Sequence, residues 1–169
     1  WMRQFGRLPN SLLHNNGDGT FTDVTIKSGL YSEFPTQAGT WNDFNNDGYP
    51  DLFIASRSYP GIYGKDPKSY LLVNDGHGHF TDIAPTKNPD IANIGMVTGA
   101  LWEDISGDKQ KELVIVGEWM APRVFAFSKD HFTEIKTSLI DKFGWWQSIA
   151  VADLNNDGRQ DLILGNIGE

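Results

Sequence analysis

The chain has 169 residues, a formal net charge of −8 and no cysteine. This length suits one compact domain or a repeat array with a substantial core. The lack of cysteine excludes a disulfide framework and Cys-ligated metal sites, and the acidity argues against nucleic-acid binding, which needs a basic face. No run approaches the ~20 apolar residues of a membrane span. The 18 glycines and 12% aromatic residues favour an all-β fold with tight turns.

The first predicted element is a β-hairpin between Leu12 and Val24, in which an apolar strand, a Gly/Asn/Asp turn and a strand beginning Phe-Thr follow one another. The pattern returns 59 residues later, between Leu71 and Ile83, and in a worn form over residues 124–135. Segments 57–68 and 85–94 are rich in Pro, Gly or polar residues and are expected to be linkers. The sequence therefore predicts a repeat whose unit contains one hairpin.

A second pattern recurs in phase with the hairpins. Residues 43–52 read Asp-Phe-Asn-Asn-Asp-Gly-Tyr-Pro-Asp-Leu, and residues 153–162 read Asp-Leu-Asn-Asn-Asp-Gly-Arg-Gln-Asp-Leu. Each loop lies between two short apolar runs that predict strands, at 39–41 and 52–55 and at 148–151 and 162–164. Oxygen-bearing side chains occupy loop positions 1, 3, 5 and 9, and the glycine at position 6 permits a bend with positive φ.

These loops predict two calcium sites, since calcium takes about 6–8 oxygen ligands. An EF-hand is excluded, because position 12 is Ile54 in one loop and Leu164 in the other rather than a carboxylate. A metal-free Asn/Asp/Gly turn is the alternative, and the duplication of the whole set argues against it. The predicted ligands are the side chains at positions 1, 3, 5 and 9 and the carbonyl at position 7, namely Asp43, Asn45, Asp47, Asp51 and Tyr49, and Asp153, Asn155, Asp157, Asp161 and Arg159.

A third and weaker copy begins at Asp104. Lys109 replaces the bend glycine and brings a cation close to the metal position, and the side chain at position 9 is a glutamate. The sequence leaves both an occupied and a metal-free loop open. The candidate ligands are Asp104, Ser106, Asp108, Gln110 and Glu112. The three loops together hold nine carboxylates, so the acidity of the chain is concentrated where cations would bind.

The order strand, acidic loop, strand, loop, strand, tight turn, strand resembles the FG-GAP/VCBS repeat family, which forms calcium-loop β-propellers in integrin α-chain heads and many bacterial surface proteins. The stretch from Asn15 to Val24 also resembles the ASPIC/UnbV-associated subgroup. The resemblance implies an all-β, partial β-propeller of about three four-stranded antiparallel blades, as closed propellers need about 4–8. We expect one domain over 1–169: a half blade 1–30, blades 36–87 and 95–137, and a half blade 146–169, in contact with the rest of a larger propeller.

The tryptophans bear on the function. Trp41 and Trp102 precede their loops by two residues and are expected to pack between blades. Trp119, Trp145 and Trp146 lie outside that register, and we expect them in the core, although an exposed patch of them would favour a sugar-binding surface.

The chain shows no nucleophile-elbow or phosphate-loop motif, so we expect no enzyme and no catalytic residue. We expect a calcium-stabilised segment of a secreted or cell-surface protein, extracellular or periplasmic, that recognises a protein or glycan. A carbohydrate-binding or accessory module of a larger exported enzyme is the alternative. A hydrolase is the third hypothesis, and it requires a carboxylate pair in a cleft away from the metal loops.

Overall fold

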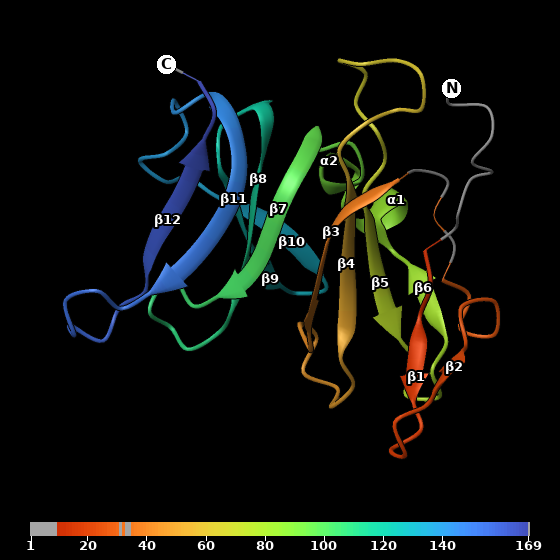
Figure 1. The fold of residues 1–169 in the computed structure, drawn as a ribbon. Helices are drawn as coiled ribbons and strands as arrows, with labels where there is room; N and C mark the ends of the chain where they lie inside the picture. The colour runs from red at the N-terminus through yellow and green to blue at the C-terminus, as the bar shows by residue number, and fades with distance from the viewer. Residues whose placement is uncertain (1–9, 31, 33–34, 169) are drawn as a thin grey trace.

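The computed structural model of the chain describes residues 10–30, 32 and 35–168, so the first nine residues and the last one of the expected half blades lie outside the described residues. The expected all-β fold is confirmed: the described strands are antiparallel and form an open array rather than a closed ring (Figure 1). The first strands, β1 (Leu13–Asn15) and β2 (Phe21–Asp23), pair with each other. They lie beside the first four-stranded sheet, where the N–H of Phe80 donates to the carbonyl of Ser28.

That sheet has the order β3-β4-β5-β6, so each strand pairs with its neighbour in sequence. Its strands are β3 (Thr36–Asn42), β4 (Asp51–Ser56), β5 (Tyr70–Asn74) and β6 (Phe80–Asp82). All six residues of β4 are buried, because β4 lies between β3 and β5 and apolar clusters cover both of its faces. The edge strand β3 instead alternates half-buried and exposed residues, as expected for a strand with one free face.

The second four-stranded unit repeats this order. It contains β7 (Met96–Glu103), β8 (Glu112–Met120), β9 (Arg123–Ser128) and β10 (His131–Ile135). The β9–β10 turn consists of Lys129 and Asp130, both with positive φ, as a two-residue hairpin turn requires. The chain then forms β11 (Gly144–Ala152) and β12 (Asp161–Asn166), which pair with each other. The end of β8 also pairs with the start of β11 and so joins two units into one sheet.

The expected linker at 85–94 is wrong in part. Two single-turn helices lie there, α1 (Ala84–Lys87) and α2 (Pro89–Ala92), each with a proline in its first turn. Proline is tolerated at this position because the first N–H groups of a helix have no partner within it. Neither helix is long or apolar enough to cross a membrane, and these are the helices of the described part of the chain.

The main core lies between the two four-stranded units and beneath α1 and α2. Phe53 and Ala55 of β4, Leu71 of β5 and Leu113 and Ile115 of β8 belong to it. Leu52 and Ile54 face the opposite side of β4, where they meet Leu30 and Leu72. The fully or nearly fully buried members of the main core are Phe44, Phe53, Ala55, Leu71, Ala84, Ile91, Ala92, Ile94, Val97, Trp102, Leu113, Ile115, Met120, Phe125 and Phe132.

The tryptophans divide differently from the prediction. Trp102 is buried and stacks on Phe44 across the two units, as expected for packing between blades. Trp41, at the matching position, is 47% exposed, because β3 has a free face. Trp119 and Trp145 were expected in the core and are instead exposed, with ring centroids 5.0 Å apart. The positions of these two residues in the sequence, each at a strand end, do not predict their exposure.

Candidate metal centre

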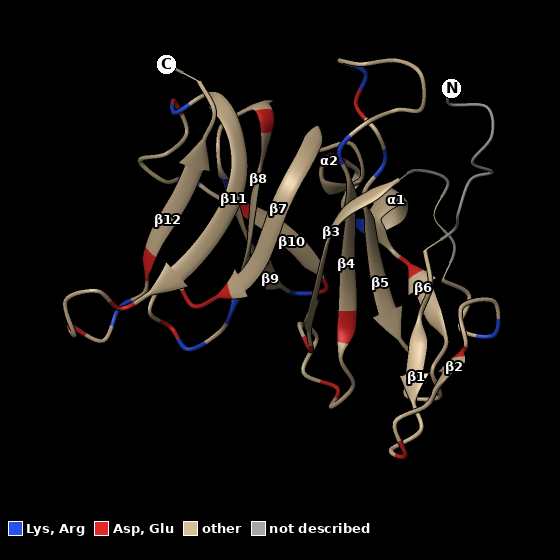
Figure 2. Cartoon of the chain, viewed as in Figure 1, with Lys and Arg blue, Asp and Glu red and all other residues tan. Residues whose placement is uncertain are grey.

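The three acidic loops lie at the same end of the molecule. They connect β3 to β4, β7 to β8 and β11 to β12, and they follow one another along the lower edge of the view (Figure 1). Asp and Glu positions recur at this edge (Figure 2). Because each loop follows the first strand of its unit, the repeat of the fold places the three loops side by side.

The loops share one internal hydrogen-bond pattern. The aspartate at position 1 accepts from the N–H at position 6, at 2.8 Å in Asp43 and 2.9 Å in Asp153. The aspartate at position 5 accepts from the N–H at position 7, at 2.9 Å from Tyr49 to Asp47 and from Arg159 to Asp157. These bonds hold the carboxylates at positions 1 and 5 on the inside of the bend.

The third loop keeps the pattern despite its different sequence. Asp104 accepts from the N–H of Lys109 at 2.8 Å, and Asp108 accepts from the N–H of Gln110 at 2.8 Å. Lys109 has φ of 72°, close to the 82–90° of the glycines at this position in the other loops. The glycine of this loop stands at position 4, where Gly107 replaces an asparagine that also has positive φ. The backbone shape is therefore common to all three loops.

Asp51, at position 9 of the first loop, is a fully buried carboxylate with an incompletely satisfied oxygen. Its Oδ1 accepts from the N–H of Asn74 at 2.9 Å, whereas Oδ2 makes no hydrogen bond of good geometry in the described part of the chain. Burial raises the pKa of Asp51 to about 6; the backbone N–H groups of Asn74 and Phe44 oppose this rise, and the charges of Asp47 and Asp43 add to it. A buried carboxylate oxygen without a partner is costly unless a cation binds it.

The third loop brings three carboxylates closest together. Oxygens of Asp104, Asp108 and Glu112 all lie within 4.8 Å of one another, and this is the one such group found in the described residues. Glu112 is buried and accepts from the N–H groups of Ile105 and Ser106 at 2.8 and 3.0 Å. The longer side chain of glutamate thus reaches the same loop interior that aspartate reaches in the other copies.

The first and last loops assemble less tightly. Asn45 and Asn155 direct their amide nitrogens to Asp47 and Asp157, at 2.8 and 3.1 Å, so these predicted ligands lie beside the position-5 carboxylates. Asp161 accepts from the N–H of Leu154 at 3.0 Å, the same link from position 2 to position 9 that Glu112 makes. The carboxylates of these loops do not form a group of three within the distance met by the third loop, among the residues described.

Sequence reasoning missed Phe44, which connects the first loop to the core. Phe44 occupies position 2 and is 5% exposed. Its ring stacks on Trp102 at a centroid distance of 5.7 Å and meets Phe127 and Phe132 edge-on, each at 5.0 Å. Leu154, at the same position in the last loop, is exposed. An aromatic residue inside an otherwise polar loop was the available signal.

Four-stranded antiparallel units that follow one another, each with an acidic loop after its first strand, define a repeat protein of the β-propeller class. The chain belongs to the FG-GAP-like repeat family, whose profile matches residues 5–54, 43–115 and 104–164. The expected family is thereby confirmed.

Curated relatives match nearly the whole chain. It is 29% identical to cartilage acidic protein 1 of Homo sapiens over 175 aligned residues, which is 94% of the chain and 24% of that protein. The proteins of the same name from Mus musculus and Xenopus tropicalis are each 28% identical, with 94% of the chain and 25% of those proteins covered. The chain thus spans about a quarter of the length of these relatives.

Proposed function

We propose that the chain is a calcium-binding, non-catalytic interaction module of a secreted or cell-surface protein. The observation that carries the proposal is Asp51, whose carboxylate is fully buried, pairs with no Lys or Arg in the described residues and has an Oδ2 without a well-formed hydrogen bond. The donor set fits calcium, because carboxylate, amide and carbonyl oxygens are the ligands that this ion takes in flexible loops. The close carboxylates of Asp104, Asp108 and Glu112 support a third site, so we propose three.

Calcium would act on structure rather than on chemistry. The residues at positions 1, 3, 5, 7 and 9 would hold the ion, which neutralises the loop and fixes the turn between the first two strands of each unit. In the first loop this turn also carries Phe44, which packs into the core between the two units. Binding of the ion would therefore stabilise the junction between neighbouring units as well as the loop.

An extracellular location follows from the supply of the ion. Modules with loops of this kind bind calcium at about 10⁻⁴–10⁻³ M, a level found outside cells. The relatives are named for cartilage and for acidity, and the chain itself has a formal charge of −8. A role in adhesion or partner recognition agrees with this location.

The absence of catalysis is part of the proposal. Glu118 lines a cleft with Asp66 away from the metal loops. Burial raises the pKa of Glu118, but hydrogen bonds from Arg57, Gln147 and Tyr63 outweigh it and hold the pKa below its usual range. A carboxyl group that stays ionised near neutral pH is a poor general acid, which a glycosidase requires.

The variant Asp51→Asn tests whether the first loop binds calcium, because the substitution should stabilise the chain in chelator and destabilise it in calcium. In a chelator, the substitution removes a buried charge and should raise the free energy of unfolding by roughly 1–3 kcal/mol. In calcium it removes a ligand and should lower the melting temperature relative to the unsubstituted chain. The measurement is thermal and urea unfolding of both proteins in chelator and in excess calcium.

The matched control is Asp47→Asn, at an exposed ligand position of the same loop. This variant should lose part of the calcium-dependent gain and change the melting temperature in chelator less than Asp51→Asn does, since the side chain that loses its charge is exposed. Calcium that leaves the melting temperature of the unsubstituted chain unaltered would sink the proposal.

A further inference from the structure

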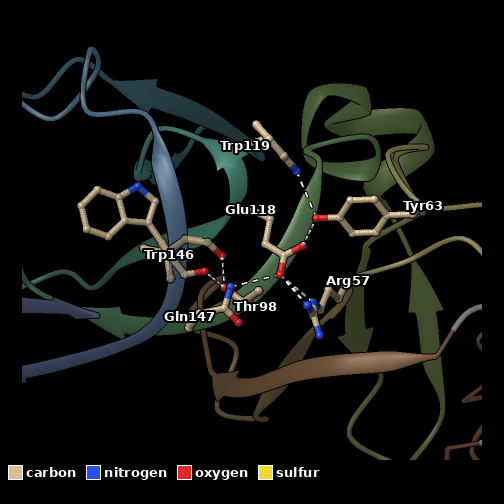
Figure 3. A network of polar contacts seen from close by, with 8 residues as sticks. Arg57, Tyr63, Thr98, Glu118, Trp119, Trp146 and Gln147 are labelled. Atoms are coloured by element: carbon tan, nitrogen blue, oxygen red, sulfur yellow. Dashed lines mark hydrogen bonds and ion pairs between the residues drawn. The ribbon is translucent and has the colours of Figure 1, made fainter. Parts of the chain in front are cut away.

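Glu118 is a buried charge at the junction of three structural units. It lies near the end of β8, at the opposite end of the strand from Glu112, and is 3% exposed. Its Oε1 accepts from Nε of Arg57 at 2.9 Å and from Gln147 at 3.0 Å, and its Oε2 accepts from the hydroxyl of Tyr63 at 3.0 Å. Arg57 and Tyr63 follow β4, whereas Gln147 belongs to β11 (Figure 3).

The next residue, Trp119, has a strained backbone conformation. Its φ is 61°, in the left-handed region that costs a non-glycine residue roughly 1–2 kcal/mol. Its indole Nε1–H donates to the hydroxyl of Tyr63 at 3.1 Å (Figure 3), and its ring meets that of Trp145 edge-to-face. The side chain is nevertheless 61% exposed. Because the indole N–H is already bonded, the surface that Trp119 offers to a ligand is its apolar ring.

An open cleft of about 450 Å³ lies beside this ring. Polar groups lie at its side, where Glu118, Asp66 and Tyr63 line it. The charged residues that line the cleft are Asp66 and Glu118; Glu118 is paired with Arg57, whereas Asp66 makes no ion pair within the described residues. The pairing leaves one net negative charge at the cleft, which disfavours an anionic ligand, and the Asp66 carboxylate and the Tyr63 hydroxyl offer hydrogen-bonding groups to a neutral one.

We propose that the cleft formed by Trp119, Tyr63, Asp66 and Glu118 binds a neutral pyranose unit of a glycan. A pyranose has an apolar C–H face, which stacks on an aromatic ring, and a rim of hydroxyl groups that both donate and accept hydrogen bonds. The ring of Trp119 would stack on the apolar C–H face of the sugar, as rigid aromatic side chains do at recognition sites. Asp66 and the hydroxyl of Tyr63 would hydrogen-bond to the hydroxyl groups of the sugar.

Glu118 acts here as a positioning residue. Its bonds to Arg57 and Gln147 fix the end of β8 against the neighbouring units, and Trp119 is the residue that follows. The inference rests on the proposed role as an interaction module and names the chemistry of its partner. It does not depend on the metal loops for its contacts, since they lie at the other end of β8.

The test is binding of the chain, in excess calcium, to a printed array of neutral oligosaccharides that end in glucose, galactose, mannose or N-acetylglucosamine. The array also carries sulfated and sialylated counterparts, and a basic-peptide array is probed in parallel. Soluble forms of the bound glycans are then titrated by calorimetry. We expect binding to neutral glycans at millimolar or lower dissociation constants.

The decisive variant is Trp119→Gly, which removes the ring and suits the positive φ. It should weaken glycan binding about tenfold or more with only a small change in melting temperature, because the relief of backbone strain offsets the lost contacts with Tyr63 and Trp145. Trp41→Ala is the matched control, as Trp41 is also exposed but lies on β3; it should leave binding unchanged.

Four outcomes overturn the inference. They are no glycan binding by a chain that still gains stability from calcium, binding restricted to sulfated or sialylated glycans, glycan binding that Trp119→Gly leaves intact, and Trp119-dependent binding confined to basic peptides. The first of these leaves the proposed metal function standing. A chain that fails to respond to calcium but binds neutral glycans through Trp119 would instead refute the metal proposal and retain the sugar site.

Discussion

The residue at position 6 differs among the three acidic loops, although its backbone does not. Gly48 and Gly158 have φ of 90° and 82°, and Lys109 has φ of 72°. A lysine in this region is strained by about 1–2 kcal/mol relative to the ordinary helical or extended backbone. Lys109 also lines a cleft shared with Asp43 and Asn46 of the first loop. Its positive charge therefore lies between two proposed metal sites.

Lys109→Gly should consequently improve both stability and calcium binding. Relief of strain, offset by the greater freedom of glycine in the unfolded chain, should raise the free energy of unfolding in chelator by about 0.5–1 kcal/mol. Removal of the positively charged lysine side chain should lower the dissociation constant for calcium several-fold. Urea unfolding and calcium titration by calorimetry measure the two effects.

Lys111→Gln is the control for charge alone. Lys111 lines the same cleft, so this variant should tighten calcium binding without the gain in chelator. If the Lys109→Gly protein in chelator is less stable than the unsubstituted chain in chelator, the strain argument is wrong.

The gathering of the loop carboxylates inside one bend could be predicted from the sequence, but their burial could not. The spacing of Asp43, Asp47 and Asp51 places oxygens inside one bend, and the structure places their charges close enough for the first two to raise the pKa of the third. Asp51 is buried as the first residue of β4, and it accepts a hydrogen bond from Asn74, which comes from a different strand of the sheet. Spacing within one loop carries no information about such a contact.

At the scale of elements, β8 joins the parts of the molecule. Its first residue, Glu112, belongs to an acidic loop, its middle is core, and its end pairs with β11. A single charge within the apolar run 113–120 marked Glu118 in the sequence, but its partners lie 61 and 29 residues away. The strand was therefore predictable from its apolar run, whereas the network around Glu118 was not.

Glu118 makes the stability of the chain sensitive to acid. Burial raises its pKa, but the hydrogen bonds from Arg57, Gln147 and Tyr63 outweigh burial, so the folded pKa lies below the usual value. The stabilising contribution is then fully present above the unfolded pKa of about 4.3 and is lost as the pH falls through the folded value. Glu118→Gln should cost about 1–3 kcal/mol at neutral pH, and this difference should shrink toward zero in acid.

Urea unfolding of both proteins in chelator, from neutral pH to about pH 3, measures this difference without a contribution from bound metal. Glu134→Gln is the matched control, because Glu134 pairs with Arg123 within one hairpin and its side chain is 38% exposed. Its cost should be small at every pH. A Glu118→Gln penalty that stays constant down to the lowest pH would rule out the charged network as its origin.

At the scale of the whole molecule, the repeat explains where the acidity lies. Nine carboxylates fall in three loops at one end, and they exceed the formal net charge of −8 of the chain. The all-β architecture and the family were predictable, because motif order and period are properties of the sequence. The exposure of Trp119 and Trp145 was not predictable, since it depends on how one unit stands against the next.

The repeat predicts the number of bound ions. Native mass measurement in calcium should show three ions on the unsubstituted chain, because all three loops share one backbone shape. Asp47→Ala, Asp108→Ala and Asp157→Ala should each remove one ion, since each takes the position-5 carboxylate from one loop. Acidification should release all ions as the carboxylates gain protons. An Asp108→Ala protein with an unchanged ion count would show that the third loop is not a site.

The pairing of β8 with β11 has a mechanical consequence. Their backbone pairs, Met120 with Gly144 and Glu118 with Trp145, join the two sheets at the end remote from the acidic loops. Tension that pulls the acidic loops apart would separate β8 from β11 progressively, starting at the end where the two strands are not paired. Tension applied at the Trp119 end would instead act directly on these backbone bonds, while the Arg57–Glu118 ion pair ties the same end of β8 to the first unit. A partner bound at this end would therefore pull where β8 is linked to both of its neighbours.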